Sequence, residues 1–305
     1  MSLNPVRRID TARPTREGAG VNLHRAFGFG ETDLTDPFLL FDDFRGDREQ
    51  DYSAGFPWHP HRGIETVTYV LAGTVEHGDS LGNSGTLGAG SIQWMTAGSG
   101  IIHQEMPKGD EAGRMHGFQL WANLPRELKM SDPRYQDIPG DEVAVRFEDD
   151  GTIIRVLCGE YGGVRGPVDG IAAAPRYLDV TVPAGRTKSF PVDLQSRAFA
   201  YVFEGTGSFR GASGPRPVPY EIEEGVIARK PVEVDNRSIV VFDSGDEVRV
   251  AAGEEGLRFL LVSGRPIREP VAWYGPIVMN TQAELEQAFR EFRQGSFIKK
   301  GGRFG

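Results

Sequence analysis

The sequence lacks several features that mark common classes of protein. It has 305 residues but one cysteine, Cys158, so it can form neither an intramolecular disulfide nor a cluster of thiolate metal ligands. It has no run of about 18 apolar residues, and its first ten residues contain no apolar stretch of the signal-peptide kind. These absences predict a soluble protein of the reducing cytoplasm that does not enter a membrane.

Positive charge is also in short supply. Lys and Arg number 34 against 43 Asp and Glu, which gives a formal net charge of −9. An excess of negative charge opposes binding to a phosphate backbone, so we expect no direct binding to nucleic acid. The 39% hydrophobic and 25% charged residues are typical of a globular chain and exclude a disordered polyelectrolyte.

Histidine is absent from the 189 residues that follow His116. All six histidines therefore lie in the first 116 residues, at His24, His59, His61, His77, His103 and His116. Any chemistry that uses imidazole is expected in this N-terminal part.

What the chain has in abundance is glycine and proline. The 40 glycines and 20 prolines fall at short intervals between runs of β-forming residues, a pattern that predicts an all-β sandwich or barrel. The predicted strands are Ile64–Leu71, Ser91–Thr96, Gly117–Ala122, Ile153–Cys158, Arg176–Val182, Ala198–Phe203, Ser238–Phe242 and Leu257–Val262.

One helix is predicted near the end of the chain. Thr281 stands three residues before Glu284, the spacing of a capping box at a helix N-terminus. Apolar residues then recur at helical spacing, at Leu285, Ala288, Phe289 and Phe292. We expect this helix to lay its apolar face on a sheet.

Two short repeats indicate a duplicated β-domain. The segment Tyr69–Thr74 is echoed by Tyr201–Thr206, and Phe118–Trp121 is loosely matched by Phe259–Val262. The turn-rich segment Leu124–Glu142 is interpreted as the connection between the two copies. We therefore predict an N-terminal domain over residues 1–135 and a C-terminal domain, with the terminal helix, over residues 136–305.

Two pairs of side chains in the N-terminal domain suit a metal ion. His59 and His61 are two residues apart, so on an extended strand both project from one face, and Pro60 between them fits a strand edge. His103 and Glu105 repeat this spacing with an imidazole and a carboxylate. If the two pairs face each other inside a barrel, four ligands converge on one divalent ion.

The residues alone leave several alternatives open. Three imidazoles and a carboxylate serve Fe(II), Mn, Ni, Cu and Zn alike. Glu65 shares the face of His61 on an extended strand, so it competes with Glu105 as the carboxylate ligand or accepts a hydrogen bond from a ligand imidazole. Trp94, Met95 and His77 are further candidates for the pocket wall or for contacts behind the ligands. Arg62 is interpreted as a surface or carboxylate-pairing residue.

Longer motifs resemble the pirin family of bicupins. They are the segments 36–44 (DPFLLFDDF), 58–69 (WHPHRGIETVTY), 79–85 (DSLGNSG), 93–98 (QWMTAG), 103–107 (HQEMP), 117–125 (GFQLWANLP) and 275–281 (GPIVMNT). The resemblance covers nearly the whole chain. It implies two tandem cupin β-barrels of jelly-roll type, of which only the first holds a metal ion.

The resemblance also implies an activity and a ligand set. By position the ligands are His59, His61, His103 and Glu105, and the ion is iron. Some pirins resemble quercetin 2,3-dioxygenases, which open a flavonol with O₂ and release carbon monoxide, and Glu105 would then receive the proton of the substrate's 3-hydroxyl as the catalytic residue. Other pirins resemble regulatory proteins that bind a transcription factor or a metabolic enzyme, which keeps a protein partner as the alternative. Residues 191–193, where the second copy should carry its two histidines, read Pro-Val-Asp.

Overall fold

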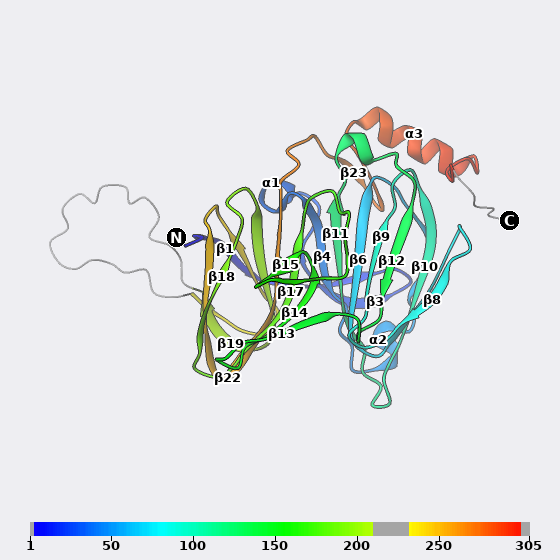
Figure 1. Ribbon diagram of the computed structural model, residues 1–305. Coiled ribbons are helices and arrows are strands. Elements are labelled where there is room, and N and C mark those ends of the chain that lie inside the picture. The colour runs from blue at the N-terminus through cyan, green and yellow to red at the C-terminus, as the bar shows by residue number, and fades with distance from the viewer. Residues whose placement is uncertain (1–2, 210–231, 300–305) are drawn as a thin grey trace. The chain divides into compact units, whose positions relative to one another are not determined.

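The computed structural model describes residues 3–209 and 232–299, and strands dominate them. They form two compact units (Figure 1). One unit, which we call the histidine unit, comprises Ala12–Ala144, Gly166–Ala174 and Pro266–Gly305. The other, the second unit, comprises Met1–Thr11, Val145–Arg165 and Pro175–Arg265. The all-β prediction with one substantial C-terminal helix is confirmed.

The units differ from the predicted division at residue 135 because each end of the chain belongs to the unit built from the opposite half. Strand β1 (Val6–Thr11) pairs with β21 (Ser238–Phe242) in the second unit. The segment from Pro266 onward, with the terminal helix, belongs to the histidine unit. Sequence repeats report duplicated strands, but they carry no information about which sheet a terminal segment joins.

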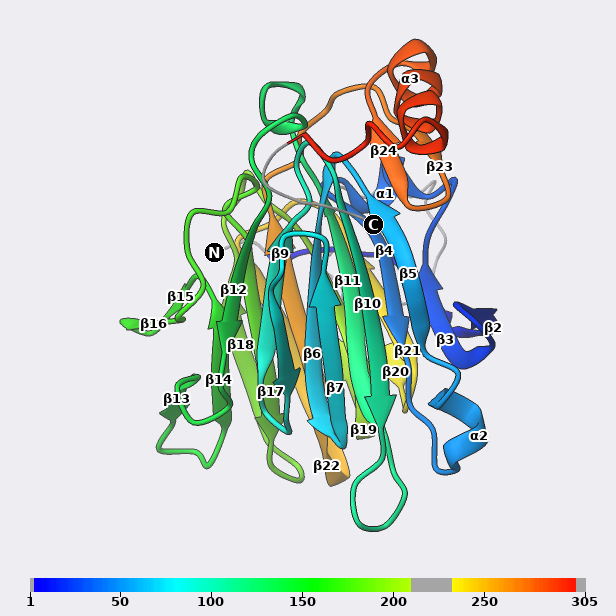
Figure 2. The ribbon, with the colours of Figure 1, turned by 90° about the vertical axis from the view of Figure 1, so that its right-hand side faces the viewer.

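Two sheets build the histidine unit. The seven-stranded sheet has the order β12-β9-β6-β11-β4-β3-β2. Its strands are β12 (Arg134–Ile138), β9 (Ile92–Thr96), β6 (Ile64–Ala72), β11 (His116–Asn123), β4 (Phe38–Asp43), β3 (Val21–Phe27) and β2 (Arg13–Glu17). The four-stranded sheet has the order β5-β10-β7-β8, and β5, β10 and β7 are visible in Figure 2. Its strands are β5 (Phe56–His61), β10 (Ile101–Lys108), β7 (Thr74–Asp79) and β8 (Ser84–Leu87).

Smaller elements complete this unit. Helices α1 (Thr32–Thr35) and α2 (Glu49–Tyr52) are single turns, and η1 (Arg126–Leu128) is a turn of 3₁₀ helix. The hairpin of β23 (Ala272–Tyr274) and β24 (Ile277–Met279) precedes α3 (Gln282–Arg293), which packs against it (Figure 1). None of the helices in the described residues is long and apolar enough to cross a membrane.

Helix α3 begins as the sequence predicts. The Thr281 side chain accepts from the Glu284 backbone, and the Glu284 carboxylate accepts from the Thr281 backbone, so the capping box is confirmed. Leu285 and Ala288 are buried in a cluster that also holds Phe297. Phe292, at the end of the predicted apolar stripe, is 40% exposed.

The second unit is one folded sheet of nine strands with the order β1-β21-β19-β22-β17-β14-β13, in which β18 pairs with β22 and β20 with β19. The further strands are β13 (Ala144–Phe147), β14 (Ile153–Cys158), β17 (Arg176–Val182), β18 (Thr187–Pro191), β19 (Arg197–Phe209), β20 (Val232–Val234) and β22 (Glu247–Gly264). A short hairpin joins β15 (Glu160–Tyr161) and β16 (Val164–Arg165). The core of the unit is a continuous apolar cluster that includes Phe190, Phe209 and Phe259.

Residues 191–193, where the second copy should carry its two histidines, differ in burial. Pro191 and Asp193 are exposed, whereas Val192 between them joins the apolar cluster. The neighbouring Phe190 is fully buried in the same cluster. Aliphatic and aromatic side chains thus occupy the interior, and the carboxylate of residues 191–193 points away from it.

All eight predicted strands lie within or over observed strands. The predicted connection Leu124–Glu142 differs, because it contains β12, which pairs with β9 through Tyr135 and Met95. Exposed and half-buried residues alternate weakly along β12, so its sequence carries no clear strand signal.

Gly63 lies in the turn between β5 and β6, and its backbone conformation predicts that substitution lowers the stability of the protein strongly. Its φ is +78°, and a Cβ atom would lie 1.9 Å from the Val278 carbonyl oxygen. We expect Gly63→Ala to lower the free energy of unfolding by about 2 to 4 kcal/mol, through left-handed strain and displacement of β24. All four tryptophans belong to the histidine unit, so urea unfolding followed by tryptophan fluorescence reports on this unit.

Gly82 is the matched control for this substitution. Its φ is +91°, yet within the described chain no atom lies within 4 Å of the position that a Cβ would take. Gly82→Ala should therefore cost only the conformational strain, about 1 kcal/mol. Equal losses in the two variants would contradict the packing argument for Gly63.

Candidate metal centre

Two antiparallel strands bring three histidines together. His59 and His61 lie on β5, and His59 is paired with His103 on β10. Strand β5 is the edge of its sheet, so Pro60 is accommodated without loss of a ladder hydrogen bond, as its position between the histidines predicts. Alternation along β5 then directs both of its imidazoles to one face.

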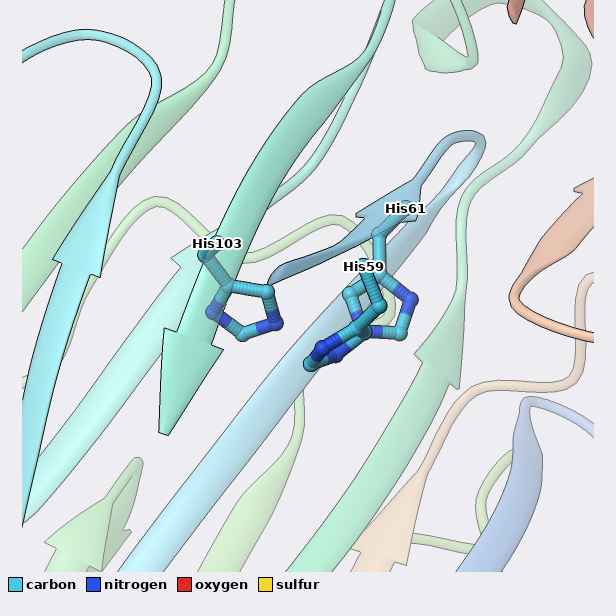
Figure 3. A group of neighbouring side chains, drawn as sticks. All are labelled: His59, His61 and His103. Atoms are coloured by element: carbon cyan, nitrogen blue, oxygen red, sulfur yellow. The ribbon is translucent and has the colours of Figure 1, made fainter. Parts of the chain in front are cut away.

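The imidazoles converge closely. One ring nitrogen from each of the three lies within 4.8 Å of the other two. The ring centroids are 4.8 Å apart for His59 and His61, 4.4 Å for His59 and His103, and 5.0 Å for His61 and His103. Figure 3 shows the three rings pointing toward one another from the two strands.

Hydrogen bonds of the β5 histidines define which ring nitrogen holds the proton. Nδ1 of His59 lies 2.9 Å from the Pro57 carbonyl oxygen, and Nδ1 of His61 lies 3.2 Å from the Pro276 carbonyl oxygen. A carbonyl only accepts, so each Nδ1 carries the proton and each Nε2 of a neutral ring presents a lone pair. The two Nε2 atoms are 3.0 Å apart and repel unless a cation lies between them.

Burial keeps the rings of His61 and His103 neutral. It holds the pKa of both His61 and His103 well below the usual range for histidine, and the neighbouring imidazoles lower both pKa values further. Neither ring nitrogen of the buried His103 has a hydrogen-bond partner among the described residues. Neutral imidazole is the form that binds a metal ion, so the donor set fits a divalent cation.

The structure places Glu105, rather than Glu65, beside the histidines. Oε2 of Glu105 lies 3.9 Å from Nε2 of His103, and its Oε1 accepts a hydrogen bond from Thr68 at 3.0 Å. Oε1 of Glu65 instead accepts from Thr96 at 2.8 Å. The carboxylate that can complete the histidine cluster is therefore that of Glu105.

Glu65 nevertheless supports a prediction about pH. Burial raises the pKa of Glu65 from about 4.5 to about 7, although the hydrogen bond from Thr96 favours its charged form. Between pH 4.5 and pH 7 the Glu65 carboxyl is ionised in the unfolded protein but keeps its proton in the folded protein. The free energy of unfolding therefore falls as pH rises across this range. Glu65→Gln should remove this loss. As pH rises across this range, the free energy of unfolding of the variant should therefore increase by about 2 to 3 kcal/mol relative to that of the unsubstituted protein.

Urea unfolding at pH 4.5 and pH 8 measures this difference. Glu111→Gln, at an exposed glutamate of the same unit, is the control, because an exposed carboxylate is solvated in both states. A Glu65→Gln variant whose stability follows that of the unsubstituted protein across the pH range would contradict the prediction.

A cavity of about 780 Å³ opens beside the histidine cluster. His59, His61 and Glu105 line it, together with apolar and aromatic side chains that include Trp121 and Trp273. The two indole rings are 6.1 Å apart, and Trp121 also packs edge-on against His61 at 5.0 Å. The volume lies in the range of small-molecule sites.

The predicted wall residues lie elsewhere. Trp94 and Met95 are fully buried in the core and do not line the cavity. His77 also lies outside the cavity lining, although it is paired with Glu105 across β7 and β10, and its Nε2 is 3.4 Å from an Asp137 oxygen.

Several cavity residues could not be recognised in the sequence. Trp273 and Pro276 come from the C-terminal segment, which the sequence assigns to the other domain. Arg25, Asp42 and Gln119 come from three neighbouring strands of the seven-stranded sheet. The local sequence around Asp42 shows only two aspartates after the apolar run 38–41, which does not tell which of them faces a cavity.

Comparison with known proteins gives consistent matches over both halves of the chain. The family model described as Pirin matches residues 20–122, and that described as Pirin C-terminal cupin domain matches residues 177–298. A pirin-like protein of Caulobacter vibrioides is 45% identical over 298 residues, which cover 97% of this chain and 100% of that protein. Pirin of Homo sapiens is 38% identical over 285 residues, which cover 92% of this chain and 90% of that protein.

A solved structure extends these matches. The crystal structure of a quercetin 2,3-dioxygenase from Acinetobacter baumannii superposes with a TM-score of 0.82 at 28% sequence identity. The superposition covers 97% of this chain and 99% of that chain. The fold is thus shared over nearly all of the residues that the structure describes.

Proposed function

This chain belongs to the pirin family, and from that premise we propose that it is a metal-dependent dioxygenase that opens flavonols such as quercetin with O₂. The observation that carries the proposal is the cluster of three imidazoles, two of which line an apolar, aromatic cavity. A flat aromatic substrate suits such a cavity, and a metal centre beside it suits chemistry with dioxygen. The similarity to a quercetin 2,3-dioxygenase supports the same substrate class.

We assign the metal ligands to His59, His61, His103 and Glu105. A divalent ion held there, for which we propose Fe(II), supplies Lewis acidity toward a hydroxyl oxygen and a site for dioxygen. The Pro57 and Pro276 carbonyls keep the two β5 imidazoles in the tautomer that presents Nε2 to the ion.

The remaining side chains bind the substrate and exclude water. Trp121 and Trp273 line the cavity, where a planar molecule can pack against indole rings, and the apolar wall keeps the reacting ring away from bulk solvent. Glu105 lines the cavity, so its carboxylate can receive the proton of the substrate's 3-hydroxyl. One O₂ is consumed and one carbon monoxide is released for each flavonol that is opened.

Anaerobic reconstitution followed by exposure to air tests the proposal. Protein purified without a metal-affinity column is analysed for its elements, loaded with Fe(II) under argon and mixed with quercetin. On admission of air we expect loss of flavonol absorbance with matching O₂ uptake and carbon monoxide release. Chelated protein and free Fe(II) at the same concentration are the controls, because flavonols oxidise slowly on their own. Loaded protein that is no faster than free Fe(II) would contradict the proposed activity.

A further inference from the structure

A row of polar side chains crosses the seven-stranded sheet. Asp42 of β4 is paired with Arg25 of β3 on one side and with Gln119 of β11 on the other. Gln119 is in turn paired with Thr68 of β6. Arg25, Asp42 and Gln119 all line the cavity, so the row lies on the face that the substrate would meet.

Apolar side chains flank this row. Leu40 and Phe44 are two residues either side of Asp42, Trp121 is two residues beyond Gln119, and all three line the cavity. Side chains alternate between the faces of a strand, so these residues share the face of the polar row. The row is thus a narrow hydrogen-bonding band in an otherwise apolar wall, which is the usual means of orienting a ligand.

The row meets the candidate metal centre at Thr68. Its Oγ1 lies 3.0 Å from Oε1 of Glu105 and 2.7 Å from Oε1 of Gln119. A hydroxyl has one proton, so Thr68 cannot donate to two acceptors. Both contacts are satisfied when Thr68 donates to the Glu105 carboxylate and the Gln119 amide is turned by 180°, so that its NH₂ takes the place of Oε1 and donates to Thr68. The amide oxygen of Gln119 is then left to accept a hydrogen bond from another group.

The carboxylate of Asp42 is a second acceptor, and Arg25 fixes it. Nε and one terminal nitrogen of Arg25 donate to the two Asp42 oxygens at 2.8 and 2.7 Å, and the other terminal nitrogen donates to Glu17 at 2.9 Å. Each carboxylate oxygen can accept more than one hydrogen bond. Burial raises the pKa of Asp42 to about 6, so the group is ionised above neutral pH.

We propose that Gln119 and Asp42 form a second polar subsite, which accepts hydrogen bonds from hydroxyl groups on the part of the substrate that lies away from the metal ion. Both groups are acceptors, so the subsite selects hydroxyl donors and disfavours a carboxylate or sulfate at the same place. Strands in a sheet are about 4.8 Å apart, which puts Asp42 about 10 Å along the row from Thr68, within the span of a planar molecule of two or three rings. The inference rests on the proposed function and specifies it: the substrate class is polyhydroxylated rather than bare flavonols.

Binding without turnover tests this subsite. Metal-loaded protein at pH 8 under argon is titrated with quercetin and with 3-hydroxyflavone, which keeps the 3-hydroxyl and lacks the others. Quenching of tryptophan fluorescence reports binding, because Trp121 and Trp273 line the cavity. We expect the unsubstituted protein to bind quercetin about tenfold more tightly than 3-hydroxyflavone. Gln119→Met and Asp42→Asn should each reduce this preference to about twofold to threefold.

Gln93→Met is the matched control. Gln93 is paired with Thr68 on the other side of the row, donates to Asp137 at 2.9 Å and does not line the cavity, so this variant should keep the tenfold preference. An unchanged preference in both test variants, or an equal loss of affinity for the two flavonols, would overturn the subsite and leave the proposed function standing. Failure of the unsubstituted protein to bind either flavonol would overturn both.

Discussion

His103→Ala is expected to empty the candidate metal centre and to abolish flavonol turnover. His103 is the one histidine that β10 contributes, and its ring nitrogens have no hydrogen-bond partner among the described residues. Without it, two imidazoles of one strand remain, with Glu105 beside them. Loss of a group behind a ligand already weakens metal binding about 10- to 100-fold, so loss of the ligand itself should exceed about 100-fold. Elemental analysis should then fall from about one ion per chain to about a tenth or less.

His116→Gln provides the control for this result. His116 lies on β11, where its Nε2 is 3.6 Å from an Asp43 oxygen, and it is not part of the histidine cluster. The variant should keep its metal ion and its turnover, and the tryptophan emission of both variants shows whether the histidine unit is folded. A folded His103→Ala protein that binds one ion with unchanged affinity would show that the ion is held elsewhere.

The sequence predicts the part of this centre that depends only on residues close together in the chain. Two histidines around a proline define one face of an extended strand, and the structure places both rings on that face. The sequence alone does not distinguish Glu65 from Glu105 as the carboxylate ligand, because alternation along a strand gives both carboxylates a face shared with a histidine. It is the pairing of β10 with β5 that brings Glu105 to the cluster.

The rest of the site depends on contacts between distant segments. The Pro276 carbonyl that orients His61 lies 215 residues further along the chain. The polar row through Asp42 exists only once β3, β4 and β11 are in register, and a shift of one residue in any strand would remove it. Neither pairing partner nor register follows from local hydrophobic patterns, so these residues could not be predicted.

Arg62→Met is expected to destabilise the histidine unit strongly, because it removes a buried charge that holds two distant segments together. Arg62 is 1% exposed, so it is not the surface residue that was one interpretation of the sequence. It pairs with the carboxylate of Glu291, in agreement with the other interpretation. Nε donates to the Ser99 carbonyl at 2.7 Å, and the terminal nitrogens donate to Glu291 and to the Phe297 carbonyl, each at 2.8 Å. The guanidinium also lies 4.2 Å from the centroid of the Phe297 ring. Breaking a buried charge pair costs about 3 to 5 kcal/mol, and two carbonyls would lose their donor as well.

Arg290→Met, on helix α3, is the control, because it also removes an arginine charge but at an exposed position. Arg290 faces Glu286 at 4.0 Å with both side chains more than half exposed, so its loss should cost no more than about 0.5 kcal/mol. Urea unfolding of the metal-free proteins, followed by tryptophan fluorescence, compares the two variants without the stabilisation that a bound ion adds. A large loss for Arg62→Met alone means that the residue next to His61 anchors α3 and the segment after it to the strand that carries the two histidines. Equal small losses would instead mean that α3 is held by its apolar contacts, through Leu285 and Ala288, and that the buried charge contributes little.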